Sequence, residues 1–311
     1  MKRFKPRYRY VSKKRQTIEK IAMVGCVAVF IVCAWLLIDY YGQKTAHDRQ
    51  NQALEEMYLA SDDVQPEEEE KEEEATPAPV QETTPAPVSA NADPARQSSY
   101  PDNPNKTVSS RFAELRQTYP DIVGRLKIDG VISEYVVQRD NEYYLRRDIS
   151  GKSNSNGTIF MDEDVNLQVP PPVITLYGHN MKLGAMFGFM KSYESADYYK
   201  AHPFIVFDTL YEECDWVILA QCVLSLNKDS LKYVDLYALM YGNATARLTQ
   251  VQRVAELSSF SVPLDVCASD RLILLVTCTD SNNDVRRVLL GRKIRSDETR
   301  QQIKEIVAKA Q

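Results

Sequence analysis

The chain has 311 residues and a formal net charge of −5, and 44% of its residues are hydrophobic. This charge is the sum of opposite segments: residues 1–20 hold nine Lys or Arg and one Glu, whereas residues 61–88 hold ten Asp or Glu and one Lys. The remainder is close to balanced, so the composition favours neither a nucleic-acid-binding surface nor a generally acidic one. The first hundred or so residues are unsuited to a hydrophobic core, so we expect one globular domain.

The basic N-terminus is followed by an apolar segment. Residues 21–38 carry no charge over eighteen positions, which just reaches the roughly 17–25 residues that span a bilayer as a helix. All the basic residues of the first segment precede it, so the positive-inside rule places the N-terminus in the cytoplasm. A cleaved signal peptide is the alternative, but no A-x-A-like site follows. We predict a cytoplasmic segment over 1–20 and an uncleaved signal anchor over 21–41.

The next segment, residues 42–108, has the composition of a stalk. Its start, up to residue 60, is compatible with a continued helix that has a thin apolar stripe. Runs of glutamate and two copies of Thr-Pro-Ala-Pro-Val follow, and both favour extended backbone over a packed core. The glutamates lack the spaced ligands and turn glycine of a calcium loop, so we interpret the segment as a solvated linker.

Residues 109–311 have the pattern of a globular domain that is mainly β. Apolar segments of strand length are expected at 131–137, 157–161, 173–177, 204–208, 216–224, 272–277 and 288–294. Helical patterns occur at 110–118, after Leu183, at 230–240, at 244–257 and at 296–310. Many short strands with few helices between them predict a barrel or a sandwich.

Three reactive side chains lie at the ends of predicted strands. Cys278 closes one apolar segment, the pair Arg286-Arg287 opens the next, and His179 follows a third within Thr175-Leu-Tyr-Gly-His-Asn-Met181. A cysteine, a histidine and an arginine are the components of a thiol acyl-transfer site.

These motifs resemble those of class B sortases. The similarity rests on residues 175–181, on Leu275-Val-Thr-Cys278 and on the arginine before Val288-Leu-Leu290, and it extends over residues 122–294. It implies a sortase-type eight-stranded β-barrel with a helical insertion before the cysteine strand. It also implies a cysteine transpeptidase, or thiol protease, at the surface of Gram-positive bacteria, with its catalytic domain extracellular.

The resemblance assigns Cys278 as the nucleophile, His179 as the acid and base, and Arg287 as the cation at the oxyanion. The chemistry agrees, because a thiolate is the reactive form, histidine exchanges protons near neutral pH and arginine stays charged. Because adjacent strand residues face opposite sides, Arg286 is expected on the outer face. Asp280, Thr277 and Asn180 are candidates for orienting the catalytic groups or binding the substrate. Asp280 is equally compatible with a residue that organises the turn.

One departure from the family pattern concerns recognition. Many class B enzymes have a serine two residues before the nucleophile, where this chain has Val276. The expected substrates are surface proteins with an Asn-Pro-x-Thr-x type sorting signal, cut after threonine. The expected acceptor is an amine of a peptidoglycan precursor or of a pilin, so housekeeping attachment to the cell wall and pilus polymerisation both remain open.

Other side chains point to no further chemistry. Asp162-Glu-Asp164 is interpreted as a solvated turn, and His202 as a cap or surface residue. Cys214, Cys222 and Cys267 are expected to be buried structural thiols. The chain has no C-x-x-C, H-E-x-x-H or Walker pattern, so we expect no metal and no cofactor.

Two alternative functions are compatible with the motifs. A membrane-tethered barrel that binds without catalysis would keep the fold but lack a fast-reacting thiol. A cysteine L,D-transpeptidase would carry a Ser-His-Gly-Cys cluster, which is absent here.

Overall fold

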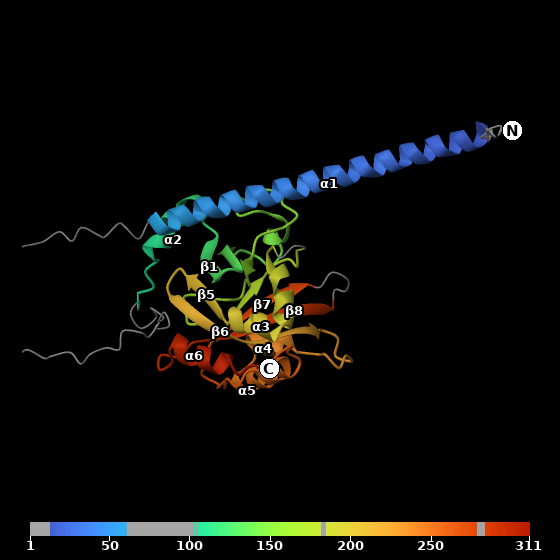
Figure 1. Ribbon diagram of the computed structural model, residues 1–311. Helices are drawn as coiled ribbons and strands as arrows, with labels where there is room; N and C mark the ends of the chain where they lie inside the picture. The colour runs from blue at the N-terminus through green and yellow to red at the C-terminus, as the bar shows by residue number, and fades with distance from the viewer. Residues whose placement is uncertain (1–12, 61–102, 104, 182–184, 279–283) are drawn as a thin grey trace, which may run out of the picture. The chain divides into compact units, whose positions relative to one another are not determined.

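The structure is a computed structural model, and it describes residues 13–60, 103, 105–181, 185–278 and 284–311. The chain divides into two compact units, Met1–Gln50 and Asn51–Gln311. The first unit contains most of helix α1 (Lys13–Ala60), drawn in blue in Figure 1. Among the described residues, one helix, Glu19–Ala60, is long and apolar enough to cross a membrane. Large apolar side chains of the predicted span, including Phe30 and Ile38, are exposed in the structure.

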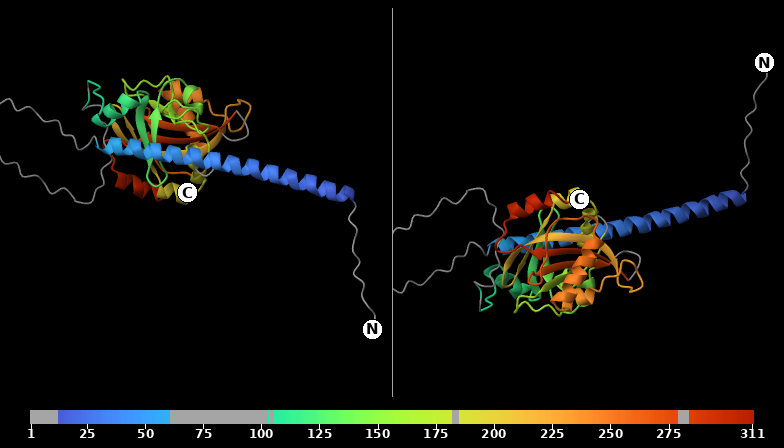
Figure 2. Two further views of the ribbon diagram at one scale, coloured as in Figure 1. Left: turned by 90° about the horizontal axis from the view of Figure 1, so that it is seen from above. Right: turned by 90° about the horizontal axis from the view of Figure 1, so that it is seen from below.

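The second unit is built on a closed barrel of eight strands, in the order β1-β2-β3-β4-β7-β8-β6-β5 (Figures 1 and 2). The strands are β1 (Ile122–Ile128), β2 (Ile132–Val137), β3 (Phe160–Met161), β4 (Val173–Tyr177), β5 (Phe204–Thr209), β6 (Glu213–Ser225), β7 (Leu272–Cys278) and β8 (Val285–Lys293). Neighbouring strands are antiparallel except for the parallel pairs β2–β3 and β4–β7. The predicted eight-stranded barrel is confirmed.

The alternating side chains of strand β7 contribute to two hydrophobic clusters, one on each face of the sheet. Because side chains alternate along a strand, Ile273 and Leu275 join the larger core cluster, whereas Leu274 and Val276 join a second cluster on the other face. The second cluster also contains residues of the two helices that connect β6 to β7. These helices, α4 (Leu236–Tyr241) and α5 (Ala244–Glu256), therefore cover one outer face of the barrel and are the helical insertion that the sequence predicts.

The remaining helices are short and surround the barrel. They are α2 (Ser110–Thr118), η1 (Tyr143–Arg146), η3 (Phe187–Glu194), α3 (Ala196–Ala201) and α6 (Arg300–Val307). Helix α6 begins with a capping box, in which Thr299 and Gln302 each accept a hydrogen bond from the other's backbone N–H. His202 is the C-cap of α3, as predicted.

The end of α1 packs into the second unit, although the sequence places it in the stalk. Leu54 and Tyr58 are 1% and 2% exposed and belong to the larger core cluster. Between them, Glu55 pairs with Arg125 of β1 at 2.5 Å, and the hydroxyl of Tyr58 donates to Asp208 at 3.1 Å. Residues 51–60 are thus part of the folded domain.

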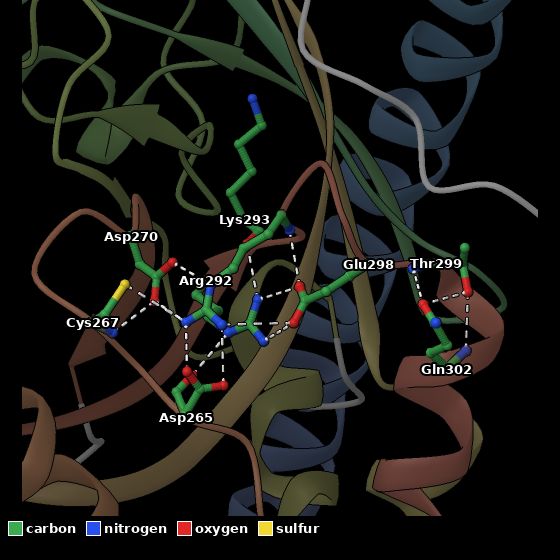
Figure 3. Close-up of polar contacts among 9 residues, drawn as sticks. Asp265, Cys267, Asp270, Arg292, Lys293, Glu298, Thr299 and Gln302 are labelled. Carbon is green, nitrogen blue, oxygen red and sulfur yellow. Dashed lines mark hydrogen bonds and ion pairs between the residues drawn. The ribbon is translucent and has the colours of Figure 1, made fainter.

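An ion-pair cluster joins β8 to the loop before β7 and to the segment between β8 and α6 (Figure 3). Arg292 is fully buried and donates two hydrogen bonds of 2.6 Å to Glu298. Arg295 binds Asp270 at 2.7 Å and Asp265 at 2.9 Å. Cys267, which Figure 3 shows at this cluster, is exposed, so the prediction that it is buried is wrong; the cluster holds its loop at the surface.

Candidate active site

The register of three neighbouring strands brings the histidine and the cysteine to one edge of the barrel. Tyr177 of β4 pairs with Val276 of β7 in a parallel arrangement. His179 and Cys278 each lie two residues beyond this pair, so both follow the same end of the sheet. On the other side of β7, Cys278 pairs with Arg286 of β8. Residues almost a hundred positions apart in sequence therefore meet in the order His179, Cys278, Arg286 across the sheet.

A cleft of about 210 Å³ opens at this edge. Its lining includes His179 and Arg286, together with Asn141, Leu145, Phe160, Tyr177, Gly178, Val276 and Thr277. The wall is mostly apolar and has a few polar groups, which is the usual composition of a small-molecule or peptide site.

Backbone contacts and one close packing interaction hold His179 in place. The backbone N–H of Phe187 donates to the carbonyl of His179 at 3.0 Å, and Asn180 forms a β-bridge with Met186. A side chain at Gly178 would lie 2.9 Å from the ring of Phe187, so only glycine fits before the histidine.

The imidazole of His179 has a fixed partner. Its Nε2 lies 2.6 Å from the carbonyl oxygen of Leu145. A carbonyl only accepts hydrogen bonds, so Nε2 must carry a hydrogen, and in the neutral ring Nδ1 is then the basic nitrogen. The Leu145 carbonyl thus orients the ring, as a carboxylate does in other cysteine and serine enzymes.

The two arginines lie in different surroundings. Arg286 lines the cleft, whereas Arg287 is 9% exposed and pairs with Glu194 at the end of η3, at 2.7 Å. Arg287 pairs across the sheet with Thr277, one position before the cysteine. Arg286 therefore lines the cleft, although the sequence favours Arg287 for the site. That expectation comes from the position of Arg287 directly before Val288 and not from the pairing of β8 with β7.

The other candidate residues are distributed as follows. Thr277 is 1% exposed and lines the cleft. Val276 also lines the cleft and belongs to the outer core cluster. Asn180 is half-buried beside the histidine. Asp280 lies outside the described residues.

Asp162 is a buried carboxylate that holds two residues of the cleft wall. The interpretation of residues 162–164 as a solvated turn is wrong for Asp162, which is 1% exposed. It accepts hydrogen bonds from Tyr177 and Asn141, both of which line the cleft. The place of Tyr177 directly before the Gly-His motif could have identified it, whereas Asn141 and Leu145 lie in a segment with no distinctive pattern.

Two of the remaining thiols are poor nucleophiles. Burial raises the pKa of Cys214 and of Cys222 to about 12, so both stay protonated at neutral pH, as expected of structural thiols. Within the described residues, no three His, Cys, Asp or Glu side chains are grouped so that they could hold a metal ion.

No protein-family model matches the chain. Sortase B of Listeria monocytogenes is 27% identical over 195 residues, which cover 62% of this chain and 77% of that protein. Sortase B of Staphylococcus aureus is 26% identical over 190 residues, which cover 60% and 75% respectively. A crystal structure of sortase B from Bacillus anthracis, in complex with AAEK1, superposes with a TM-score of 0.52 at 28% identity, over 60% of this chain and 86% of that one. The eight-stranded barrel and these matches together support the assignment of the chain as a class B sortase, a cysteine transpeptidase.

Proposed function

We propose that this transpeptidase cuts a sorting signal of the Asn-Pro-x-Thr-x type after threonine and transfers the acyl fragment to an amine. The donors would be surface proteins that carry the signal near their C-terminus. The acceptor would be an amine of a peptidoglycan precursor or of a pilin subunit. This proposal rests on the resemblance to sortase B for the substrate class and on the cleft for the chemistry.

The proposed reaction runs through a thioester on Cys278. The thiolate attacks the threonine carbonyl, and the tetrahedral intermediate expels the peptide amine, which takes a proton from the His179 imidazolium. The acceptor amine then attacks the thioester carbonyl and gives its proton back to His179, and the thiolate of Cys278 leaves. The fixed Nε2–H bond to Leu145 leaves Nδ1 as the nitrogen that carries this proton.

The single observation that carries the proposal is the shared register at the sheet edge. His179 and Cys278 both lie two residues beyond the Tyr177–Val276 pair, and Arg286 lies opposite the cysteine. Cross-strand partners share a face of a sheet, so the guanidinium of Arg286 is the one we assign to the developing oxyanion. Arg287, the residue that the resemblance selects, is the competing assignment.

The test of the nucleophile is the change Cys278→Ala in the full chain. We expect cleavage of a fluorogenic sorting peptide to be lost with little change in the melting curve, because one side chain at a strand end is removed without a core cavity. Cys267→Ser is the matched control, since that thiol is exposed but is not among the residues that line the cleft, and it should keep full turnover. Undiminished cleavage by the folded Cys278→Ala variant would refute the assignment.

We also propose that the enzyme is held in the cell membrane by residues 21–41, with its N-terminus in the cytoplasm and its barrel outside. The apolar helix and the basic residues before it support this topology. The intact protein should sediment with membranes and resist extraction by carbonate. A mature N-terminus that begins after Asp39 would show that the segment is removed as a signal peptide.

A further inference from the structure

A buried carboxylate connects three elements beside the cleft. Asp162 directly follows β3, and its side chain accepts hydrogen bonds from Tyr177 at 3.0 Å and from Asn141 at 3.2 Å through Oδ2. Its Oδ1 accepts from the hydroxyl of Tyr241 at 2.5 Å and from the backbone N–H of Asp164 at 3.1 Å. A carboxylate at 1% exposure that collects four donors is a structural junction, because a buried acceptor must be satisfied.

The donors come from different parts of the fold. Tyr177 ends β4, two residues before His179, and Asn141 lies before η1; both line the cleft. Tyr241 is the last residue of α4, the first helix of the insertion between β6 and β7. Asp162 therefore attaches the insertion to the strand that carries the histidine.

Hydrophobic contacts alone would position α4 less well. Leu239 is fully buried in the outer core cluster, but apolar contacts have little directionality and allow a short helix to shift. The hydroxyl of Tyr241 and the contact of the Tyr177 hydroxyl with Met240 Sδ, at 3.9 Å, add directional constraints at the last turn of the helix. Burial and the charge of Asp162 raise the pKa of both tyrosines, so both hydroxyls stay protonated and donate.

We infer that Asp162 is a positioning residue for the peptide substrate. It fixes Tyr177 and Asn141 in the cleft wall, and through Tyr241 it holds helix α4 against the hydroxyl of Tyr177, so it sets the shape of that wall without contacting the reacting atoms. This inference rests on the proposed function of the cleft. It separates two tasks within the site, since the thiol chemistry depends on His179 and Cys278, whereas the fit of the peptide depends on the Asp162 junction.

The test compares three variants of the full chain in a Cys267→Ser background. Asp162→Asn removes the charge at nearly constant volume, and Tyr241→Phe removes only the link to α4. Tyr237→Phe is the control, because Tyr237 lies on the same helix, packs against the ring of Tyr241 and is 74% exposed. The readouts are kcat and KM for a fluorogenic sorting peptide, and the rate at which iodoacetamide alkylates Cys278.

We expect Asp162→Asn and Tyr241→Phe each to raise KM by about five- to tenfold, the effect of one net hydrogen bond, with kcat changed less than about twofold. The double variant should be no worse than Asp162→Asn, because both changes break the same link. Alkylation should stay at the wild-type rate, and Tyr237→Phe should match wild type.

The outcomes that overturn the inference are distinct from those that overturn the proposed function. An unchanged KM in Tyr241→Phe, additive losses in the double variant, or an equal loss in Tyr237→Phe would each refute the role of Asp162. If Asp162→Asn fails to fold, Tyr241→Phe alone still decides, because its ring stays in place. A wild-type chain with no fast-alkylating Cys278 and no peptide cleavage would instead refute the proposed function.

Discussion

Arg286 and Arg287 are adjacent in β8, but Arg286 lines the cleft and Arg287 forms an ion pair outside it. Arg286 lines the cleft opposite Cys278, and its charge acts on the hydroxyl of Tyr177. Arg287 is held by Glu194 behind the sheet. Because a strand directs successive side chains to opposite faces, only one of the two arginines can take the proposed role at the oxyanion.

Conservative lysine variants test which arginine acts in the transition state. Arg286→Lys keeps a positive charge but loses the planar fork, so we expect kcat for the sorting peptide to fall about 10²–10³-fold, as when an oxyanion donor is lost. KM should change much less. Arg287→Lys keeps a positive charge that can still pair with Glu194, so kcat should stay within about threefold of wild type.

Steady-state kinetics on both variants decide which arginine acts at the oxyanion. A large loss confined to Arg287→Lys would return the oxyanion role to the residue that the family resemblance selects. It would also mean that the strand rearranges when the peptide binds.

For single residues, the sequence predicts which reactive side chains form the site, but it does not predict which side chains they contact. Cys278 and His179 are recognisable because each lies at the end of an apolar strand pattern next to a motif. The face of Arg286 depends on how β8 pairs with β7, which is a tertiary property. The burial of Asp162 depends on Tyr177 and Tyr241, whose hydroxyls come from distant segments, so a charged trio such as Asp-Glu-Asp is indistinguishable from a surface turn.

At the level of secondary structure, the sequence predicts helices with a clear apolar periodicity well. It predicts strands that contain charged residues poorly. The helices at 110–118 and 244–257 occur almost as expected. The sequence does not predict strand β1, because Gly124, Arg125 and Lys127 interrupt its apolar pattern. The charge of Arg125 is tolerated there because Glu55 of α1 neutralises it, and no local pattern reveals a partner seventy residues away.

The Arg292–Glu298 pair predicts how the C-terminal elements respond to acid. Burial opposes ionisation of Glu298, but hydrogen bonds from Arg292 and the Arg295 backbone hold its pKa below the ordinary value of 4.5. A carboxyl whose pKa is lowered by folding stabilises the fold above its ordinary pKa, and this stabilisation is lost as pH falls through the folded value. We therefore expect the urea concentration at the unfolding midpoint of the full chain to decrease as the pH is lowered below about 4.5.

The variant Glu298→Gln isolates this contribution. It leaves the fully buried Arg292 without its carboxylate, so the free energy of unfolding at pH 7 should fall by about 3–5 kcal/mol. The loss between pH 5 and pH 3 should then be smaller than in wild type. Glu305→Gln on the exposed side of α6 is the control and should keep the wild-type profile. Identical pH profiles for Glu298→Gln and wild type would rule out a stabilising role for the pair.

For the whole molecule, the most consequential feature is that α1 belongs to both units. The predicted stalk, residues 42–108, includes ten residues, Asn51–Ala60, that belong to the barrel unit. The sequence shows only a thin apolar stripe here, because the partners of Leu54 and Tyr58 lie in distant elements, namely β1, β2, β5 and α2. A domain boundary drawn from composition at residue 109 therefore falls inside the folded unit.

The last prediction measures what this helix end contributes to stability. Leu54→Ala in the full chain should lower the free energy of unfolding of the barrel by about 2–5 kcal/mol, because it leaves a cavity in the core cluster. Leu59→Ala is the matched control: Leu59 lies on the same helix but is 54% exposed, so the change should cost less than about 0.5 kcal/mol. Urea unfolding followed by the fluorescence of Trp216, which is fully buried in the barrel, reports on this domain. Equal stabilities of the two variants would show that the barrel folds independently of α1. A selective loss in Leu54→Ala would show that the helix that contains the candidate membrane span is also a structural element of the barrel domain.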